Sequence, residues 1–374
     1  MFRYPQRPGN DFEFIVGGDD FLSRLLHLLD NCKYEILFEM YLMEPGRAFD
    51  LVWAALMRSA ERGVRVYLLL DGFGSRRVLD VVQRACAISG NIHLRIFNPF
   101  SLRRFKANFR RDHRKIIIVD ADVALISGFG IVDHFYTESI GATLDKADWL
   151  DVAVVVRGVL VEDWRHLFAD TWSGPALLSL IRKTPSPGIM TGRVAFGARW
   201  NNQDIMREFR VRILRARRVV WIVSPYFVTS WRIRRLLRKA GRRGLDVRIL
   251  VPGSYSDHPP IQYASKRHYR QLLRAGVRIF EFQGAFIHAK IYLCDDWVSI
   301  GSFNLDHWTY RFNLEANQEV EHPAFVGRVA GCYEQWLLQS TEITQEVVMG
   351  RGLLERVLVY LLGKVDAWLM RLFK

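Results

Sequence analysis

The chain of 374 residues is half hydrophobic, and 13% of its residues are aromatic. This composition excludes a disordered protein, and the length is sufficient for two ordinary domains. The sequence has 53 Lys and Arg residues against 39 Asp and Glu residues, a formal net charge of +14. The positive charge favours anionic partners such as lipid headgroups, a membrane face or nucleic acid, and it is equally compatible with a generally basic soluble protein.

Cysteine spacing and the N-terminal residues indicate the cellular compartment in which the protein is expected. Four scattered cysteines show no spacing typical of a zinc site or a disulfide framework, so a reducing, cytosolic setting is expected: Cys32, Cys86, Cys294 and Cys332. The first residues lack the apolar core of a signal peptide, and no run reaches the roughly 18–20 apolar residues that span a bilayer. Any membrane contact is therefore expected from the cytosolic side.

Taken in chain order, the predicted elements form an internal repeat. Each half shows an apolar strand, a helix and a second strand, and an Arg-Gly dipeptide introduces that second strand. The ranges are 34–38, 48–61 and 64–70 in the first half and 218–223, 231–243 and 247–251 in the second. Strand–helix–strand alternation with glycine at the helix exit predicts βαβ units on a mostly parallel sheet.

Each half then reaches an apolar strand that carries a histidine, over residues 113–120 and 288–295. The stretch 184–188 is rich in Pro, Gly and Ser and is typical of a boundary. We predict an α/β fold of two similar lobes, residues 1–183 and 189–345, related by pseudo-twofold symmetry. Each lobe is expected to be a mostly parallel mixed sheet flanked by helices, followed by an amphipathic C-terminal helix over residues 346–374.

Both histidine strands carry His-x-Lys followed by four residues and Asp. Alternate side chains of a strand share a face, so His113 lies beside Lys115, and His288 lies beside Lys290. Such a pair suits a phosphate, because imidazole can act on phosphorus while the ammonium group holds a non-bridging oxygen. The aspartates of the two motifs fall on the opposite face and are interpreted as structural: Asp120 and Asp295.

A turn of small residues follows each motif, Ser127-Gly128-Phe129-Gly130 in the first half and Gly301-Ser302-Phe303-Asn304 in the second. Hydroxyl, amide and backbone N–H groups at such turns can bind a phosphoryl oxygen. The predicted phosphate-binding residues are therefore Ser127, Gly128, Gly301 and Ser302, with Asn304 among the catalytic residues. Gly130 lacks the amide that Asn304 supplies.

A carboxylate is predicted to orient each histidine. Glu315, eleven residues beyond Asn304, is expected to accept the Nδ1 proton of His288, and Asp151 is expected to pair with His113. A single His-x-Lys is usually incidental. Two complete copies at matching positions of a repeat favour a catalytic site.

These motifs resemble the phospholipase D superfamily, whose signature is His-x-Lys-x4-Asp with a Gly-Ser/Gly-x-Asn turn, usually in two copies that form one site. The resemblance extends from about Asp11 to Trp336, and the asparagine common in the first turn is replaced by Gly130. Within the superfamily the chain is most similar to bacterial cardiolipin synthases of the shorter type without N-terminal transmembrane helices. The runs that carry this similarity are 68–75, 301–306 and 313–317.

The resemblance implies two phospholipase-D-like lobes and a two-step displacement. His113 is assigned the attack on phosphorus that gives a phosphohistidine, while His288 protonates the departing alcohol and deprotonates the incoming one. Lys115, Lys290 and Asn304 would stabilise charge on the equatorial oxygens. No metal or other cofactor is expected. The residues alone leave open which histidine is the nucleophile.

Two kinds of segment bear on the substrate. The basic, apolar runs 102–111 and 231–239 could bind lipid headgroups or a nucleic-acid backbone, or form solvated helix faces. Charges interrupt the apolar C-terminus, which suits a helix lying in the bilayer interface, with Trp368 and Phe373 as anchors, or a helix packed on the protein.

The favoured function is a phosphatidyl transfer that makes cardiolipin from phosphatidylglycerol. Hydrolysis of phosphodiesters by a phospholipase D or a nuclease with the same site is the alternative. A third possibility, an inactive membrane- or nucleic-acid-binding scaffold, is disfavoured by the two intact His-Lys pairs. The expected partners are anionic phospholipids and a membrane surface, with nucleic acid less favoured, and the expected location is peripheral, on the cytoplasmic side of the bacterial inner membrane.

Overall fold

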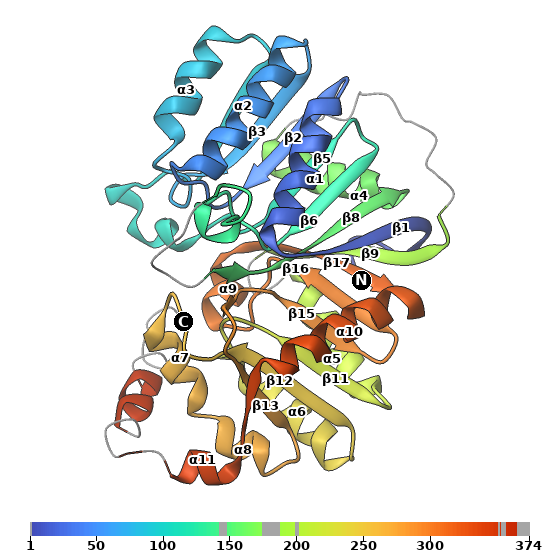
Figure 1. Ribbon diagram of the computed structural model, residues 1–374, viewed down its shortest axis with the longest axis vertical. Coiled ribbons are helices and arrows are strands. Elements are labelled where there is room, and N and C mark those ends of the chain that lie inside the picture. Colours follow the sequence, from blue (N-terminus) through green and yellow to red (C-terminus); the bar gives the residue numbers. More distant parts are fainter. Residues whose placement is uncertain are drawn as a thin grey trace.

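One continuous mixed sheet runs through both lobes of the molecule, whose N-terminal lobe lies above the C-terminal lobe in Figure 1. The structure is a computed structural model that describes residues 2–141, 148–173, 188–198, 202–350, 352 and 357–364. The strand order in the sheet is β18-β13-β12-β11-β15-β16-β17-β9-β1-β8-β6-β5-β2-β3-β4. The antiparallel pair β9–β1 joins the sheet of one lobe to that of the other.

Elements of the same type follow in a similar order in the two lobes. The N-terminal lobe contains β1 (Arg7–Val16), α1 (Gly18–Asn31), β2 (Glu35–Met40), α2 (Arg47–Glu61), β3 (Arg65–Asp71), α3 (Leu79–Ile88), β4 (Ile92–Phe97), η1 (Leu102–Phe109), β5 (Lys115–Val119), β6 (Val123–Ser127), η2 (Asp133–Phe135), β7 (Trp149–Leu150), β8 (Val152–Gly158) and α4 (Leu160–Trp172). The C-terminal lobe contains β9 (Met190–Ala198), β10 (Asn202–Gln203), α5 (Asp204–Arg215), β11 (Val219–Val223), α6 (Trp231–Arg242), β12 (Asp246–Pro252), α7 (Pro259–Lys266), α8 (Tyr269–Leu273), β13 (Arg278–Phe282), β14 (Phe286–Ile287), β15 (Ile291–Cys294), β16 (Trp297–Gly301), α9 (His307–Phe312), β17 (Leu314–Glu321), α10 (Pro323–Leu338), β18 (Ser340–Ile343) and α11 (Gln345–Met349).

The predicted βαβ units are present in both halves, as β2–α2–β3 and β11–α6–β12. In each unit the helix exit is a glycine with positive φ, Gly63 at 88° and Gly244 at 80°, a conformation that glycine adopts without steric cost. Within the large sheet, parallel pairing is confined to β2–β3–β4 and β11–β12–β13 among the described strands. The other pairs of the large sheet are antiparallel, so the α/β fold is confirmed while the expectation of mostly parallel sheets was wrong outside these units.

Three buried clusters account for the two-lobed shape. One cluster packs α1 and α2 on the N-terminal sheet, and a second packs α5 and α6 on the C-terminal sheet. The third draws residues from both lobes, including α4 and α10, and forms a shared core between them. In this shared core the Trp164 indole N–H donates to Gln318 Oε1 at 2.9 Å, which links α4 to β17 across the seam.

Parts of the predicted domain division lie outside the described residues. Of the predicted boundary 184–188, only Gly188 is described, and of the predicted C-terminal helix the structure describes residues 346–350, 352 and 357–364. Within that portion residues 357–364 are helical, and the Arg267 guanidinium donates to the Gly363 carbonyl at 2.9 Å. Among the helices in the described ranges, none has both the length and the apolar character needed to cross a bilayer.

Candidate active site

The two histidines reach the seam on short inter-lobe bridges. His113 lies two residues before β5, and its backbone N–H donates to the carbonyl of Leu314, the first residue of β17, at 3.0 Å. His288 follows β14, which pairs in parallel with β7 of the other lobe, and its N–H donates to the Leu150 carbonyl at 2.7 Å. Each histidine therefore precedes its strand and is held by backbone of the opposite lobe.

These backbone hydrogen bonds between the lobes determine which carboxylate orients which histidine. The Nδ1 atom of His113 lies 3.1 Å from Glu315 Oε2, and that of His288 lies 2.6 Å from Asp151 Oδ2. Our prediction paired Glu315 with His288 and Asp151 with His113, and it was wrong. Because Leu314 and Leu150 pair with the histidine segments of the opposite lobe, the residues that follow them point at the opposite histidines.

The two lysines lie beside the histidines and their carboxylates. Lys115 Nζ donates to the His113 carbonyl at 2.6 Å, and Lys290 Nζ donates to Asp151 Oδ2 at 3.3 Å. Burial lowers the pKa of Lys115 against the attraction of Glu315, and together with the charge of Lys290 it brings this pKa to about 7. The pKa of Lys290 is likewise lowered by burial, against the attraction of Asp151.

Both histidines are neutral in the free site at pH 7. Burial and the adjacent Lys290 lower the pKa of His288 to about 4. Burial also lowers the pKa of His113, although the Glu315 carboxylate opposes this shift. Burial opposes ionisation of Asp151, yet Lys290 and His288 hold the pKa of this carboxyl below its ordinary value. Each neutral imidazole can therefore donate from Nδ1 to its carboxylate and present the Nε2 lone pair.

The turns bring the predicted phosphate-binding residues against these carboxylates. The Ser302 hydroxyl donates to Glu315, whereas Gly128 leaves room for Asp151, whose carboxylate oxygens lie only 2.3 Å from where a Cβ would be. Ser127 Oγ and Asn304 Oδ1 are buried, with no hydrogen-bond partner among the residues that the structure describes. Of these two atoms, the Ser127 hydroxyl can donate to a phosphate oxygen, whereas an amide oxygen only accepts. Gly301 lies beside them, at the end of β16.

Gly130 departs from its counterpart Asn304 for a steric reason. A Cβ at this position would lie 3.1 Å from both the Cβ and the carbonyl oxygen of Leu42. The Gly130 carbonyl also accepts a hydrogen bond from the Tyr136 hydroxyl at 2.5 Å. The first turn is therefore closely packed, and a side chain at this position would require Leu42 to shift.

The motif aspartates lie away from the site and hold the strands. Asp120 accepts the backbone N–H groups that lead into β2, at 2.7 to 3.1 Å, and Asp295 does the same for β11 at 2.8 to 3.0 Å. These backbone hydrogen bonds lower the pKa of Asp295, although burial opposes the shift. The contacts support the structural interpretation of both residues.

Sequence reasoning missed the aromatic wall of the site. The Tyr41 ring lies 4.7 Å from the His113 ring, and the rings of Phe135, Trp149 and Phe286 lie 5.7, 5.3 and 5.8 Å from that of His288. A signal was available, because Trp149 and Phe286 lie two residues before Asp151 and His288. On an extended chain, residues two apart share a face.

A buried ionic cluster behind His113 was also missed. Arg114 Nε donates to Asp112 Oδ1 at 3.0 Å, and its Nη2 lies 2.5 Å from Glu39 Oε1 and donates to Thr171 Oγ1 at 2.6 Å. The corresponding positions of the second half are apolar: Ala289, Ile287 and Val223. The backbone repeat therefore carries different chemistry behind each histidine.

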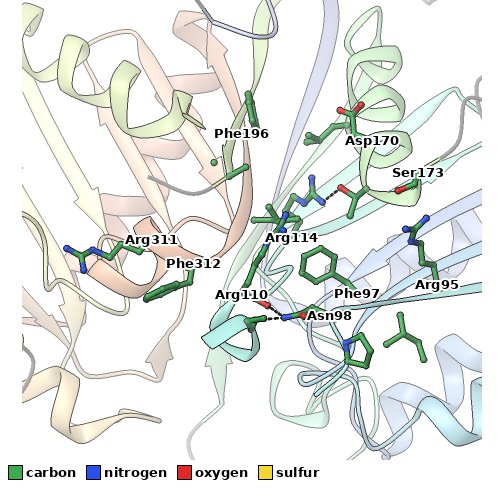
Figure 2. Close-up of a pocket in the computed structure, with 18 of the residues that line it drawn as sticks. Arg95, Phe97, Asn98, Arg110, Arg114, Asp170, Ser173, Phe196, Arg311 and Phe312 are labelled. Atoms are coloured by element: carbon green, nitrogen blue, oxygen red, sulfur yellow. Dashed lines mark hydrogen bonds between the residues drawn. The ribbon is translucent and has the colours of Figure 1, made fainter. Parts of the chain in front are cut away.

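Two cavities flank the seam outside the histidine pair. One of about 1030 Å³ has Arg95, Arg110, Arg114 and Arg311 around an apolar lining, and Figure 2 shows Arg114 at its centre between the lobes. The other, of about 1020 Å³, shares Arg3, Phe196, Ala198 and Arg311 with the first. Neither cavity is lined by His113 or His288.

The fold and the site together define a class of protein. Two histidine–lysine pairs, each with a carboxylate from the opposite lobe, meet at the seam of a duplicated α/β fold. This arrangement is chemically suited to the transfer of a phosphoryl-type group and marks the seam as the candidate active site.

Comparison with known proteins identifies the family. Residues 25–134 and 209–337 match the family described as cardiolipin synthase, PLD-like domain. Cardiolipin synthase A of Pseudomonas aeruginosa (strain LESB58) is 30% identical over 355 residues, which cover 92% of this chain and 71% of that protein. Cardiolipin synthase A of Pseudomonas fluorescens (strain SBW25) is 30% identical over 352 residues, with the same two coverages. The chain belongs to this family and is a phospholipase-D-type transferase.

Solved structures show the same fold. A phosphatidylserine synthase from Haemophilus influenzae Rd KW20 superposes with a TM-score of 0.71 at 14% identity, covering 97% of this chain and 94% of that one. A polyphosphate kinase from Porphyromonas gingivalis superposes with a TM-score of 0.55 at 14% identity. The superposition covers 87% of this chain and 50% of the kinase chain. At these identities the likeness concerns the fold alone.

Proposed function

We propose that this chain makes cardiolipin from two molecules of phosphatidylglycerol, with release of glycerol, through a phosphohistidine intermediate. The observation that carries the proposal is the pair of neutral histidines, each held at Nδ1 by a carboxylate of the opposite lobe, His113 by Glu315 and His288 by Asp151. The names of the cardiolipin synthase relatives support the choice of substrate.

In the first step the phosphatidyl group passes to the enzyme. The Nε2 atom of His113 forms a bond to phosphorus as the bond from phosphorus to the glycerol oxygen breaks, and His288 gives its proton to that oxygen. The anionic phosphodiester favours protonation of His288 on binding, because an opposite charge raises the pKa of an imidazole. Lys115, Lys290 and Asn304 stabilise the charge that develops on the equatorial oxygens.

In the second step the group passes to another lipid. The terminal hydroxyl of a second phosphatidylglycerol gives its proton to His288, its oxygen bonds to phosphorus, and the bond from phosphorus to His113 breaks. Cardiolipin leaves and both histidines return to their initial state. The aromatic rings of Phe135, Trp149 and Phe286 around His288 support an alcohol acceptor, since they limit the access of water.

Hydrolysis is the alternative outcome at the same residues. If water reached the phosphohistidine, the products would be phosphatidic acid from a phospholipid or cleaved strands from nucleic acid. The proposed partners are therefore anionic phospholipids in a membrane surface, with nucleic acid less favoured. The proposed location is peripheral, on the cytoplasmic side of the bacterial inner membrane.

The test is to incubate the purified protein with phosphatidylglycerol vesicles and to analyse lipids and glycerol together. Cardiolipin and glycerol in equal amounts are expected, whereas phosphatidic acid alone would contradict the synthase proposal. A parallel incubation with single- and double-stranded DNA tests the nuclease alternative.

Histidine variants test the shared site. His113→Ala and His288→Ala are each expected to abolish turnover, and near-normal activity of either variant would contradict the proposal. If His113 is the nucleophile, acid-labile phosphatidyl–protein adducts should accumulate in His288→Ala and be absent in His113→Ala.

A further inference from the structure

The loops that leave the parallel strands of both lobes converge on the active site. Tyr41, directly after β2, lies against the His113 ring, and Asp257, in the loop after β12, accepts a hydrogen bond from the Tyr226 hydroxyl after β11. The pKa of His288, lowered by burial, is partly raised by the Asp257 carboxylate, so this loop is close to the second histidine. The carboxyl ends of the parallel strands thus form one rim around the site.

Large apolar side chains project from this rim. They are Phe73 in the loop after β3, Phe100 and Leu102 in and after the loop that follows β4, Trp231 at the start of α6 and Tyr255 in the loop after β12. Between 44% and 83% of each residue's surface is exposed. Single exposed apolar residues are ordinary, but five around one active site, from both lobes, call for an explanation.

The segments that carry Phe73, Leu102 and Trp231 also carry exposed positive charge, whereas the loop of Tyr255 contains Asp257. Arg76, Arg77, Arg103 and Arg232 are exposed, and Arg76 lies 4.8 Å from the Phe73 ring centre. The sequence contains no Asp or Glu in residues 72–78, 98–111 or 224–232. The combination of protruding apolar side chains with arginines is typical of a surface that sits in the interface of an anionic bilayer.

We infer that Phe73, Phe100, Leu102, Trp231 and Tyr255 form a bilayer-docking rim that seats the mouth of the active site on anionic lipid. The inference rests on the proposed function, since a lipid substrate must be reached in its membrane. The aliphatic Leu102 favours a bilayer over nucleic acid, because it gains free energy by burial in an apolar medium and offers neither a charge nor a stacking face.

Vesicle co-sedimentation of the whole chain tests the rim. The double variant Phe100→Ser/Trp231→Ser should bind vesicles of equal phosphatidylglycerol and phosphatidylcholine about 100-fold more weakly, about tenfold for each ring removed from the interface. The matched control is Ile88→Ser/Leu214→Ser. These two residues are also exposed. They lie in the last turns of α3 and α5, at the opposite end of the parallel strands, so the control should bind as the wild type does.

A second pair of variants separates charge from apolar insertion. Arg103→Gln/Arg232→Gln should lose about tenfold in affinity for the anionic vesicles and little for pure phosphatidylcholine vesicles. Unchanged binding of Phe100→Ser/Trp231→Ser, or an equal loss in the control, would overturn the inference. Dependence on the arginines alone, with single-stranded DNA competing for the same surface, would also overturn it.

Vesicle binding is measured without turnover, so the docking inference can be contradicted while the proposed function stands, and the reverse. On short-chain phosphatidylglycerol below its micelle concentration, Phe100→Ser/Trp231→Ser should retain activity within about twofold of the wild type. A loss of activity on this dissolved lipid as large as the loss on vesicles would show that these side chains serve the site itself, and the docking inference would fall.

Discussion

The two histidines of the proposed active site share a backbone arrangement and differ in side-chain surroundings. His113 is oriented by Glu315, whose carboxylate also accepts the Ser302 hydroxyl, and is faced by Tyr41. His288 is oriented by the shorter Asp151, for which the absent side chain of Gly128 leaves room. The pseudo-symmetric site is thus chemically asymmetric, as a reaction that needs a nucleophile and an acid–base group requires.

The crossed carboxylates make a specific prediction at the residue scale. Asp151→Asn should alter the Nδ1 environment of His288 and leave that of His113 unchanged, while Glu315→Gln should do the reverse. Long-range ¹H–¹⁵N spectra of the histidines would report the tautomers. Each variant should lower kcat by about 10² to 10⁴-fold, because an amide cannot accept the imidazole proton in the same way. A change at His113 in Asp151→Asn would contradict the crossed pairing.

The lowered pKa of Lys115 predicts a pH dependence of ligand binding. Burial sets this pKa to about 7, so raising the pH from 7 to 9 removes a positive charge from the site. The affinity for a soluble phosphodiester, whose own charge is constant over this range, should therefore fall as the pH rises. Calorimetric titration of the wild type and of Lys115→Gln would test this.

In Lys115→Gln the affinity should be lower at pH 7 and less dependent on pH, because the titrating group is absent. A wild-type affinity that stays constant until close to pH 10.5, the ordinary lysine value, would contradict the prediction.

At the scale of elements, the last residue of each motif fixes the entry into a neighbouring strand. Asp120 and Asp295 both adopt positive φ and place their carboxylates over the backbone N–H groups that begin β2 and β11. These strands start the βαβ units, so the motif joins the strand that follows each histidine to the rest of its lobe.

Removing such a carboxylate should therefore lower the stability of the fold and leave the rate of the reaction nearly unchanged. Asp295→Ala should lower the free energy of unfolding by about 1–2 kcal/mol, at the low end for several charge-assisted bonds because the side chain is partly exposed. The kcat of the folded protein should stay within about twofold. Urea denaturation measures the first quantity.

Asp296→Ala is the matched control for this variant, because Asp296 pairs with Arg218 at the exposed surface. An exposed ion pair contributes about 0–1 kcal/mol, so its loss should have the smaller effect. A loss of turnover in Asp295→Ala with unchanged stability would contradict the structural role.

At the scale of the whole molecule, we expect the lobes to fold as one unit because they share a sheet and a core. β1 and β9 join the sheets, and Trp164 of α4 is fully buried in the shared core, bonded to Gln318 of β17. A site assembled from both lobes requires this rigidity, since a small displacement at the seam would separate each histidine from its carboxylate.

Trp164→Ala should consequently destabilise both lobes together, by about 3–5 kcal/mol. Hydrogen exchange is the appropriate measurement, since the amides of β5 and β15 can be followed separately. Their protection should fall in parallel. Full protection in one lobe with loss in the other would show that the lobes unfold independently.

The sequence by itself determined the repeat, the βαβ units and both His-x-Lys pairs. It also predicted that the two pairs form one site. These features depend on local periodicity and on residue types at fixed spacing, which persist in any packing of the chain. The structural reading of Asp120 and Asp295 came from the same alternation, which placed them opposite His113 and His288.

Only the tertiary structure decided the partners across the seam. Glu315 lies 202 positions from His113, and Asp151 lies 137 positions from His288, so no local pattern pairs them. The pairing depends on short inter-lobe bridges, Asp112 with Leu314 and β14 with β7, which form only when the lobes dock. The gathering of exposed Phe, Leu, Trp and Tyr side chains on one rim has the same origin, because loops distant in the chain meet where parallel strands end.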